Sequence, residues 1–308
     1  MLRSMYSGIS GLKNFQSKLD VIGNNISNVN TYGFKKGRTV FKDMISQTTS
    51  GASAATATRG GVNPKQVGLG SQIASIDTIH TGGSLQSTGR VLDLAISGDG
   101  FFQVADGNAN PPTAYANNLY TRAGNFYMDN RGYLVNGDGK YLMGYADDAA
   151  ATDAGTTFTN AANAPAIVSN QAGTAPAIPA GTANKPIRIP TDAQSMSVGQ
   201  DGTITFVDSA GTLKYAGQLI LSKFPNSGGL EKVGANYFSA SANSGVPFLA
   251  TATEQGMGSV TSGFLEMSNV DLSEEFTEMI VAQRGFQANT RIITTSDEIL
   301  QELVNLKR

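Results

Sequence analysis

The feature that most constrains this chain is a column of apolar residues near its C-terminus, within Ser268 to Arg308. The members of the column recur every seven residues and are Leu272, Met279, Phe286, Ile293 and Leu300. Such a spacing places them along one side of a single long helix. A helix cannot bury its own stripe, and an isolated helix gains little from propensity alone. The C-terminal helix therefore needs a partner.

A matching column lies at the other end of the chain. Its members, again seven residues apart, are Met5, Leu12, Leu19 and Ile26, with Leu2 and Ile9 between them and Ile22 in a flanking column. A 3.5-residue repeat is the coiled-coil period, so the termini are predicted to pack against each other or against copies of themselves. The alternative is an ordinary helical pair that packs on the rest of the chain.

Both helices carry local signals. Asp271 and Glu274 have the spacing of a capping box, which predicts the start of the C-terminal helix. A second column of that helix contains polar residues between its apolar ends, which fits a column that selects the register of a coiled coil or that faces water. Its members are Phe276, Gln283, Thr290, Asp297 and Val304. In the first helix Gly8, Gly11 and Gly23 each cost roughly 1 kcal/mol relative to Ala, so packing is expected to order it.

The middle of the chain reads as β structure. Leu92, Leu94 and Ile96 alternate with polar or small residues, Gly98 to Gly100 turns the chain, and Phe101 to Val104 returns, which predicts a hairpin. Further short strands are expected at Phe126 to Met128, Tyr133 to Val135, Tyr141 to Met143, Ile187 to Ile189, Met196 to Val198, Thr203 to Val207, Leu213 to Tyr215, Gln218 to Phe224 and Tyr237 to Phe238. Many short strands with Gly-rich turns indicate a sandwich or barrel.

Two segments interrupt these patterns. Ser46 to Gly61 has no large apolar residue, which predicts a linker or a loop that orders only against a neighbour. Residues 149–184 are rich in Ala, Thr, Asn, Gly and Pro, and form either a surface excursion or a small outer domain with weak strands around Phe158, Ile167, Val168 and Ile178. Between these elements, Phe34 to Phe41 holds three basic residues, which fit an anionic partner or a solvated face flanked by two Phe anchors.

These patterns predict an α+β fold with a discontinuous helical assembly domain and a central all-β domain. The expected boundaries are 1–30 and 265–308 for the terminal helices that pair as a coiled coil, 31–70 for a linker, 71–148 and 185–264 for the sandwich-like or barrel-like β domain, and 149–184 for the insertion. The 308 residues are ample for a core.

Composition narrows the function. The chain holds 22 Lys and Arg against 24 Asp and Glu, a net charge of −2, which argues against a nucleic-acid partner. The absence of Cys excludes disulfides and thiol chemistry. No apolar run is long enough to span a bilayer, so membrane insertion is not expected, and the N-terminus lacks the pattern of a cleaved secretory signal.

A search for catalytic chemistry favours a structural protein. His80 is the single histidine and has no acidic cluster around it in sequence, so a structural role is expected. Asp106 to Asn117 begins like a calcium loop but has Pro111 and Asn117 where Gly and Glu are required. The Gly-rich turns lack the setting of a nucleotide fingerprint. The sequence therefore predicts no enzyme, no cofactor and no metal site.

Several stretches carry a resemblance to a known family. They are Ser7 to Leu12, Asp20 to Lys35, Asp93 to Phe102 and Ser268 to Arg308, which together look like the bacterial flagellar rod and hook proteins. The stretch Arg59 to Thr78 resembles the hook version of the connection between helices and β domain, and Asp271 to Arg308 is similar to hook proteins of the short type found in Gram-positive bacteria. The chain departs from the long hook type, which has a substantial outer domain.

The resemblance implies a self-assembling hook subunit, in which paired terminal helices stack into an inner tube and the β domain forms the outer layer. Such a homopolymer is a curved universal joint that passes motor torque to the filament. Implied partners are the distal rod protein, the hook cap, the hook-filament junction proteins and the flagellar type III export apparatus, with export to an extracellular position without cleavage.

Two alternatives stay open: a distal rod subunit that forms a stiff shaft, and, more remotely, a secreted β-rich adhesin. The predicted self-assembly interface consists of Leu2, Met5, Ile9, Leu12, Leu19, Ile22, Ile26, Leu272, Phe276, Met279, Phe286, Ile293 and Leu300.

Overall fold

The computed structural model describes residues 2–56, 58–107, 115–146 and 184–306. The chain divides into two compact units. The helical unit comprises Met1–Val29, Lys36–Ile79 and Val270–Arg308, and the sheet unit comprises Asn30–Lys35 and His80–Asn269. Residues 149–183 of the predicted insertion, including the strands expected around Phe158 and Ile178, lie outside the described residues.

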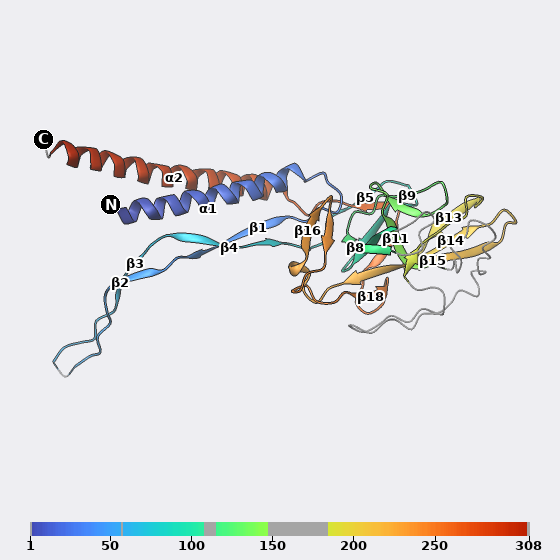
Figure 1. Ribbon diagram of the computed structural model, residues 1–308, viewed down its shortest axis with the longest axis horizontal. Coiled ribbons are helices and arrows are strands. Elements are labelled where there is room, and N and C mark those ends of the chain that lie inside the picture. The colour runs from blue at the N-terminus through green and yellow to red at the C-terminus, as the bar shows by residue number, and fades with distance from the viewer. Residues whose placement is uncertain (1, 57, 108–114, 147–183, 307–308) are drawn as a thin grey trace. The chain divides into compact units, whose positions relative to one another are not determined.

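The helical unit is built on two antiparallel helices, α1 (Leu2–Ser27) and α2 (Leu272–Asn305), which lie side by side in Figure 1. α2 begins where the capping signal predicts, because the Asp271 side chain accepts hydrogen bonds from the backbone N–H groups of Ser273 and Glu274. Neither helix, within the described residues, combines the length and hydropathy needed to cross a bilayer.

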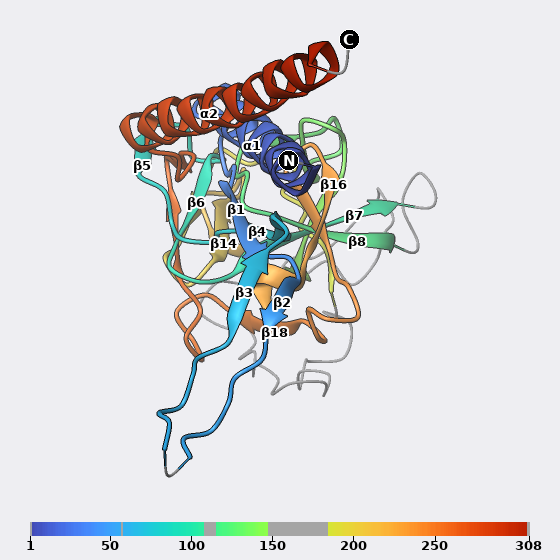
Figure 2. The same cartoon turned by 90° about the vertical axis from the view of Figure 1, so that its left-hand side faces the viewer.

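The same unit holds a long two-stranded ribbon. β1 (Gly37–Asp43) pairs antiparallel with β4 (Ser71–Thr78), and β2 (Ser46–Ser50) pairs antiparallel with β3 (Lys65–Gly68). The bridges Ser53↔Val62 and Thr56↔Arg59 continue the ribbon towards its tip (Figure 2).

The ribbon differs from the linker expected over 31–70, and the β domain does not begin at residue 71. β2 and β3 are exposed along their whole length, so the pairing of the two arms comes from backbone hydrogen bonds rather than from a buried face. Such pairing leaves no hydrophobic alternation in the sequence. That is why Ser46 to Gly61 gave no strand signal.

Within the described residues, the sheet unit forms one antiparallel sheet of 12 strands whose main path runs β13-β14-β15-β11-β7-β8-β17-β16. Its strands are β7 (Phe101–Gly107), β8 (Tyr115–Thr121), β9 (Phe126–Met128), β10 (Leu134–Asn136), β11 (Tyr141–Ala146), β12 (Lys185–Pro186), β13 (Ser195–Val198), β14 (Thr203–Val207), β15 (Leu213–Lys223), β16 (Glu231–Gly234), β17 (Tyr237–Ser239) and β18 (Phe248–Thr251). A short 3-10 helix, η2 (Ser227–Gly229), follows β15.

Two smaller strand pairs complete the sheet unit. β5 (Leu85–Ser87) pairs with β20 (Phe264–Glu266), and β6 (Leu94–Ser97) pairs with β19 (Ser259–Ser262). The predicted hairpin across Gly98 to Gly100 is therefore wrong: both strands form, but β6 pairs with β19, while β7 pairs with β8, β11 and β15. Strand existence is a local property, whereas partner choice depends on distant residues.

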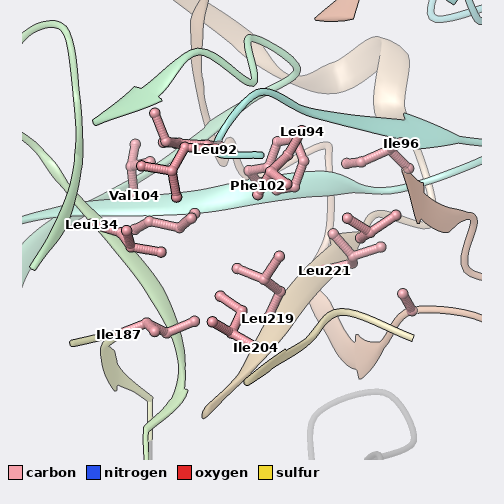
Figure 3. Close-up of a cluster of buried hydrophobic side chains, with 14 of the residues drawn as sticks. Leu92, Leu94, Ile96, Phe102, Val104, Leu134, Ile187, Ile204, Leu219 and Leu221 are labelled. Atoms are coloured by element: carbon pink, nitrogen blue, oxygen red, sulfur yellow. The ribbon is translucent and has the colours of Figure 1, made fainter. Parts of the chain in front are cut away.

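The core of the sheet unit is apolar and continuous. Leu94, Phe102, Leu134, Ile204 and Leu219 are fully buried, and Figure 3 shows such side chains pointing toward one another from several strands. Burial of each contributes about 1.5–3 kcal/mol relative to exposure. The predicted α+β class, with a helix at each end of a multi-stranded antiparallel domain, is confirmed.

Candidate assembly interface

The two helices approach each other through glycine. A Cβ atom at Gly285 of α2 would lie 2.5 Å from the Phe15 ring, and one at Gly11 of α1 would lie 2.8 Å from Oδ1 of Asn289. Gly8 also meets α2, at Ile293. Glycine therefore permits a close backbone approach here, a reason for Gly8 and Gly11 that the helix-propensity argument missed. A Cβ atom at Gly23 would meet no atom within 4 Å outside the adjoining backbone of its own helix.

The apolar columns flank this contact rather than fill it. The residues of α2 buried in the unit are Glu275, Ala282 and Ser296, which form a heptad column of their own. Of the predicted interface residues, Ile22 is buried; Met5, Leu12, Leu19, Ile26, Met279, Ile293 and Leu300 are half-buried; and Ile9, Leu272, Phe276 and Phe286 are exposed. The side chain of Leu2 lies outside the described part of the structure.

α1 also packs against the ribbon. The ring centroids of Phe15 and Phe41 of β1 are 6.3 Å apart, and the Asn14 amide donates a 2.8 Å hydrogen bond to the Ser71 hydroxyl of β4. Ser10 lies against Gly70, which has φ +122° and no room for a side chain. α1 is thus held between α2 and the ribbon.

Asn25 joins the three parts of the helical unit and is 1% exposed. Its amide NH₂ donates to the Gly37 carbonyl at 2.9 Å and to Oε2 of Glu275 at 3.1 Å, while its carbonyl accepts from the Gly37 N–H at 2.9 Å. A buried amide with both ends satisfied fixes one register among α1, α2 and β1. Sequence reasoning missed this residue because nothing in its local context marks it.

A charged cleft of about 310 Å³ opens beside this junction. Lys18 pairs with Glu278, and Lys36 pairs with Glu274 at 2.7 Å. Both glutamates are about half exposed, so each pair contributes less than about 1 kcal/mol. These ion pairs orient α2, because Lys18 belongs to α1 and Lys36 directly precedes β1.

In the sheet unit, a buried ion cluster fixes the segment Asn30–Lys35. The Lys35 ammonium lies 2.6 Å from Oε1 of Glu266, and the Arg122 guanidinium lies 3.2 Å from Oε2 of the same carboxylate. Lys35 also donates to the Thr81 carbonyl at 2.7 Å. Burial lowers the pKa of Lys35, against the opposing attraction of Glu266. Of the two alternatives for the basic residues of Phe34 to Phe41, an anionic partner or a solvated face, the solvated face is wrong for Lys35, because its side chain has no measurable exposure.

The backbone of the same segment is fixed as well. The Gly33 N–H donates to the Glu266 carbonyl at 2.8 Å, and the Asn236 amide donates to the Tyr32 carbonyl at 3.0 Å. Gly33 has φ +69°, and a Cβ there would lie 2.6 Å from the backbone at Arg122. Only glycine fits this position, so the sequence Tyr32-Gly33-Phe34 is a docking element.

His80 lies among aromatic rings. Its ring meets Phe101 and Phe238 edge-on at centroid distances of 5.5 and 5.2 Å. Burial, with the nearby charges of Lys35, Lys232 and Arg122, lowers the pKa of His80 to about 4, so the imidazole is neutral at pH 7. Among the described residues, no group of three His, Asp or Glu side chains is arranged to hold a metal.

The architecture defines a class of protein: a β-rich body whose two chain ends pair as helices that retain exposed apolar surface. Three family descriptions match the chain: "Flagella basal body rod protein" over residues 5–35, "Flagellar hook protein FlgE/F/G D1 domain" over 95–206, and "Flagellar basal body rod FlgEFG protein C-terminal" over 261–306.

Relatives agree with these matches. The "Flagellar basal-body rod protein FlgG" of Bacillus subtilis is 54% identical over 309 residues, covering 100% of both chains. From Borreliella burgdorferi, the hook protein FlgE is 34% identical over 449 residues and the rod protein FlgG is 34% identical over 311 residues, each covering 100% of both chains. The chain belongs to the flagellar rod and hook protein family.

Proposed function

We propose that this chain is a structural subunit of the flagellar rod, and that it polymerises through its paired terminal helices into a straight shaft. The subunit has no catalytic role. The observation that carries self-assembly is the apolar surface of α2, where Phe276 is 49% exposed and Ile280 is 59% exposed. A soluble monomer rarely keeps so much apolar surface on one helix without a partner.

The predicted interface residues keep their role in this proposal. Leu12, Leu19, Met279 and Phe286 flank the α1–α2 contact and are only partly covered within one chain. Neighbouring copies would complete their burial, which contributes roughly 1 kcal/mol for each half-exposed large apolar side chain.

The rod is favoured over the hook by length and identity together. The Bacillus subtilis relative named as a rod protein aligns over 309 residues at 54% identity. The Borreliella burgdorferi hook protein needs an alignment of 449 residues, well beyond this chain of 308. A hook-type relative therefore carries additional chain that has no counterpart here.

A hook subunit is the second candidate. The 34% identity to both the hook protein and the rod protein of Borreliella burgdorferi supports it, as does the resemblance of Arg59 to Thr78 to the hook version of the connection. As a hook subunit the chain would form the curved joint between rod and filament, with the rod, cap and junction proteins as neighbours. In either position it would be exported through the flagellar apparatus.

Immunogold electron microscopy of isolated hook and basal-body particles separates the two positions, with antibody raised against the purified chain. We expect label confined to the straight shaft. Label along the curved segment would move the assignment to the hook, and label on neither would refute the flagellar function.

Two substitutions test the helical contact itself. Leu12→Asp and Phe286→Asp place a charge beside the helix pair, and each is expected to abolish polymerisation and leave soluble monomer. Leu213→Asp, at an exposed position of β15 in the sheet unit, is the control. Normal tubes from both helix variants would contradict the proposed interface.

A further inference from the structure

α1 has an uncovered stripe on the side opposite α2. Tyr6 is 68% exposed, Ile9 is 50% exposed, and Lys13 is also exposed. Their spacing of three and four residues is that of coiled-coil positions. At about 100° per residue they fall within about 60° of the helix circumference, on the side facing away from Gly8 and Gly11. α1 therefore has a second surface, formed by Tyr6, Ile9 and Lys13, that another helix could cover.

The C-terminal turns of α2 carry a stripe with the same spacing. Ile299, Leu303 and Leu306 are 42%, 48% and 82% exposed. The antiparallel register, which sets Gly8 against Ile293, brings the start of α1 beside residue 299. The last turns of α2 thus extend past α1, and no described residue of the same helix pair covers them.

The two stripes have opposite charge. Lys13 follows the apolar pair on α1 and forms no ion pair with any described residue. Glu298 and Glu302 border the apolar stripe of α2, both exposed, and they form none with described residues either. These glutamates are four residues apart on one helix face, where like charges repel. A lysine placed between them would relieve that repulsion.

We propose that the C-terminal turns of α2 and the residue that caps them, residues 299–306, dock on the Tyr6–Ile9–Lys13 stripe of α1 in a second copy of this chain. The inference rests on the proposed self-assembly and names one of its contacts. Each stripe spans about 10 Å at 1.5 Å per residue, so their lengths match. The contact pairs apolar with apolar residues and Lys13 with Glu298 and Glu302.

The geometry also sets the kind of assembly. The two surfaces are different, so the contact is heterologous: the copy that contributes its α2 stripe keeps its α1 stripe free, and the other copy keeps its α2 stripe free. Such a contact does not close on itself as a two-fold dimer does, and its repetition builds a ring or an open filament. The contact cannot form within one chain, because the Tyr6 stripe faces away from its own α2.

Charge reversal tests the pairing. Lys13→Glu is expected to raise the critical concentration for polymerisation, measured by sedimentation, about tenfold or more, and Glu298→Lys combined with Glu302→Lys is expected to do the same. The three substitutions together should restore polymerisation towards the original value. Lys42→Glu, an exposed lysine on β1, is the matched control, and far-UV circular dichroism verifies that each variant is folded.

Cross-linking tests proximity directly, because the chain has no Cys. Ile9→Cys and Leu303→Cys occupy the middle of the two stripes and are prepared as separate proteins. When mixed, polymerised and mildly oxidised, they should form disulfide-linked dimers containing one chain of each kind, in excess over either protein alone. Ile9→Cys with Val233→Cys, exposed on β16, is the control mixture.

The outcomes separate this inference from the proposed function. Polymers that form normally after charge reversal, or that give no mixed dimers, would overturn the docking contact and leave self-assembly intact. Failure of the unmodified chain to polymerise at all would refute the proposed function, and the docking contact with it.

Discussion

The sharpest prediction concerns the buried cluster of the sheet unit. Glu266→Gln retains the volume of the side chain but removes its charge, which leaves Lys35 and Arg122 buried as two cations, 0% and 4% exposed. Breaking a buried ion pair on one side costs about 3–5 kcal/mol. Lys35 keeps the Thr81 carbonyl at 2.7 Å, so we expect a loss near the lower end, about 3 kcal/mol. That loss is a large part of the free energy of unfolding of a typical domain, about 5–15 kcal/mol.

Urea unfolding followed by tyrosine fluorescence measures this loss, since the chain has 10 Tyr and no Trp. The matched control is Asp99→Asn, which breaks an ion pair with Lys223 at 3.0 Å where Asp99 is 68% exposed; its expected cost is below about 1 kcal/mol. Lys35→Met added to Glu266→Gln should recover part of the loss by removing one unpaired cation. If Glu266→Gln cost no more than Asp99→Asn, the argument that this cluster fixes the segment 30–35 would fail.

Three further predictions use the same assays. Gly285→Ala should push the Phe15 ring off α2 and so weaken polymerisation, because a Cβ there would lie 2.5 Å from the ring. At Gly23 an added Cβ would meet no atom within 4 Å, so Gly23→Ala should stabilise α1 by up to about 1 kcal/mol. Equal effects of the two substitutions would contradict the glycine contact. His80 has a pKa of about 4 in the folded protein against 6.5 in the unfolded chain, so between these pH values the unfolded state binds more protons. The free energy of unfolding should therefore fall as the pH drops from 6.5 to 4, by at most about 3 kcal/mol. This fall should be smaller in His80→Gln. Tyr237→Phe removes the hydroxyl that donates to Asp138 and accepts from Asn136, with an expected loss of about 1–2 kcal/mol in urea unfolding.

The sequence predicted features that depend on neighbouring residues. The start of α2 follows from Asp271, whose side chain caps it. The Gly-rich turns expected between the short strands include Gly132 and Gly202, and both glycines have positive φ, a conformation in which glycine carries no steric penalty. Such signals are contained within a few residues, so no knowledge of the tertiary structure is needed to recognise them.

The buried cluster could not be predicted in the same way. Lys35 and Glu266 are 231 residues apart in the chain, and the residues next to each of them in the sequence do not identify the other as its partner. The basic run from Lys35 to Arg38 looks uniform in sequence, yet Lys35 is buried while Arg38 is 62% exposed. Only the fold decides which lysine faces a carboxylate.

The candidate interface likewise combines a feature that the sequence predicted, the two helices, with one that it did not, the residues through which they touch. The heptad period correctly indicated two helices that need a partner, but not which column faces that partner. Gly8, Gly11 and Gly285 lie in the contact because a close approach requires small residues, and an analysis based on apolar residues counts glycine only as a cost. The apolar columns were therefore assigned to the helix pair, where they are only half covered.

This arrangement has an energetic consequence for assembly. The contact between the helices includes glycine, alanine and serine positions, and the apolar columns beside it are only partly covered within one chain. Residues such as Ile9, Phe276 and Ile299 are 50%, 49% and 42% exposed. The free energy of burying their remaining apolar surface, about 25 cal/mol per Å², would be gained only when another copy covers them. Under the proposed self-assembly, a polymer therefore buries apolar surface at every subunit that a single chain leaves exposed. Stability that depends on neighbours favours growth at an existing end over association of free chains, because an end presents the complementary surfaces already in place.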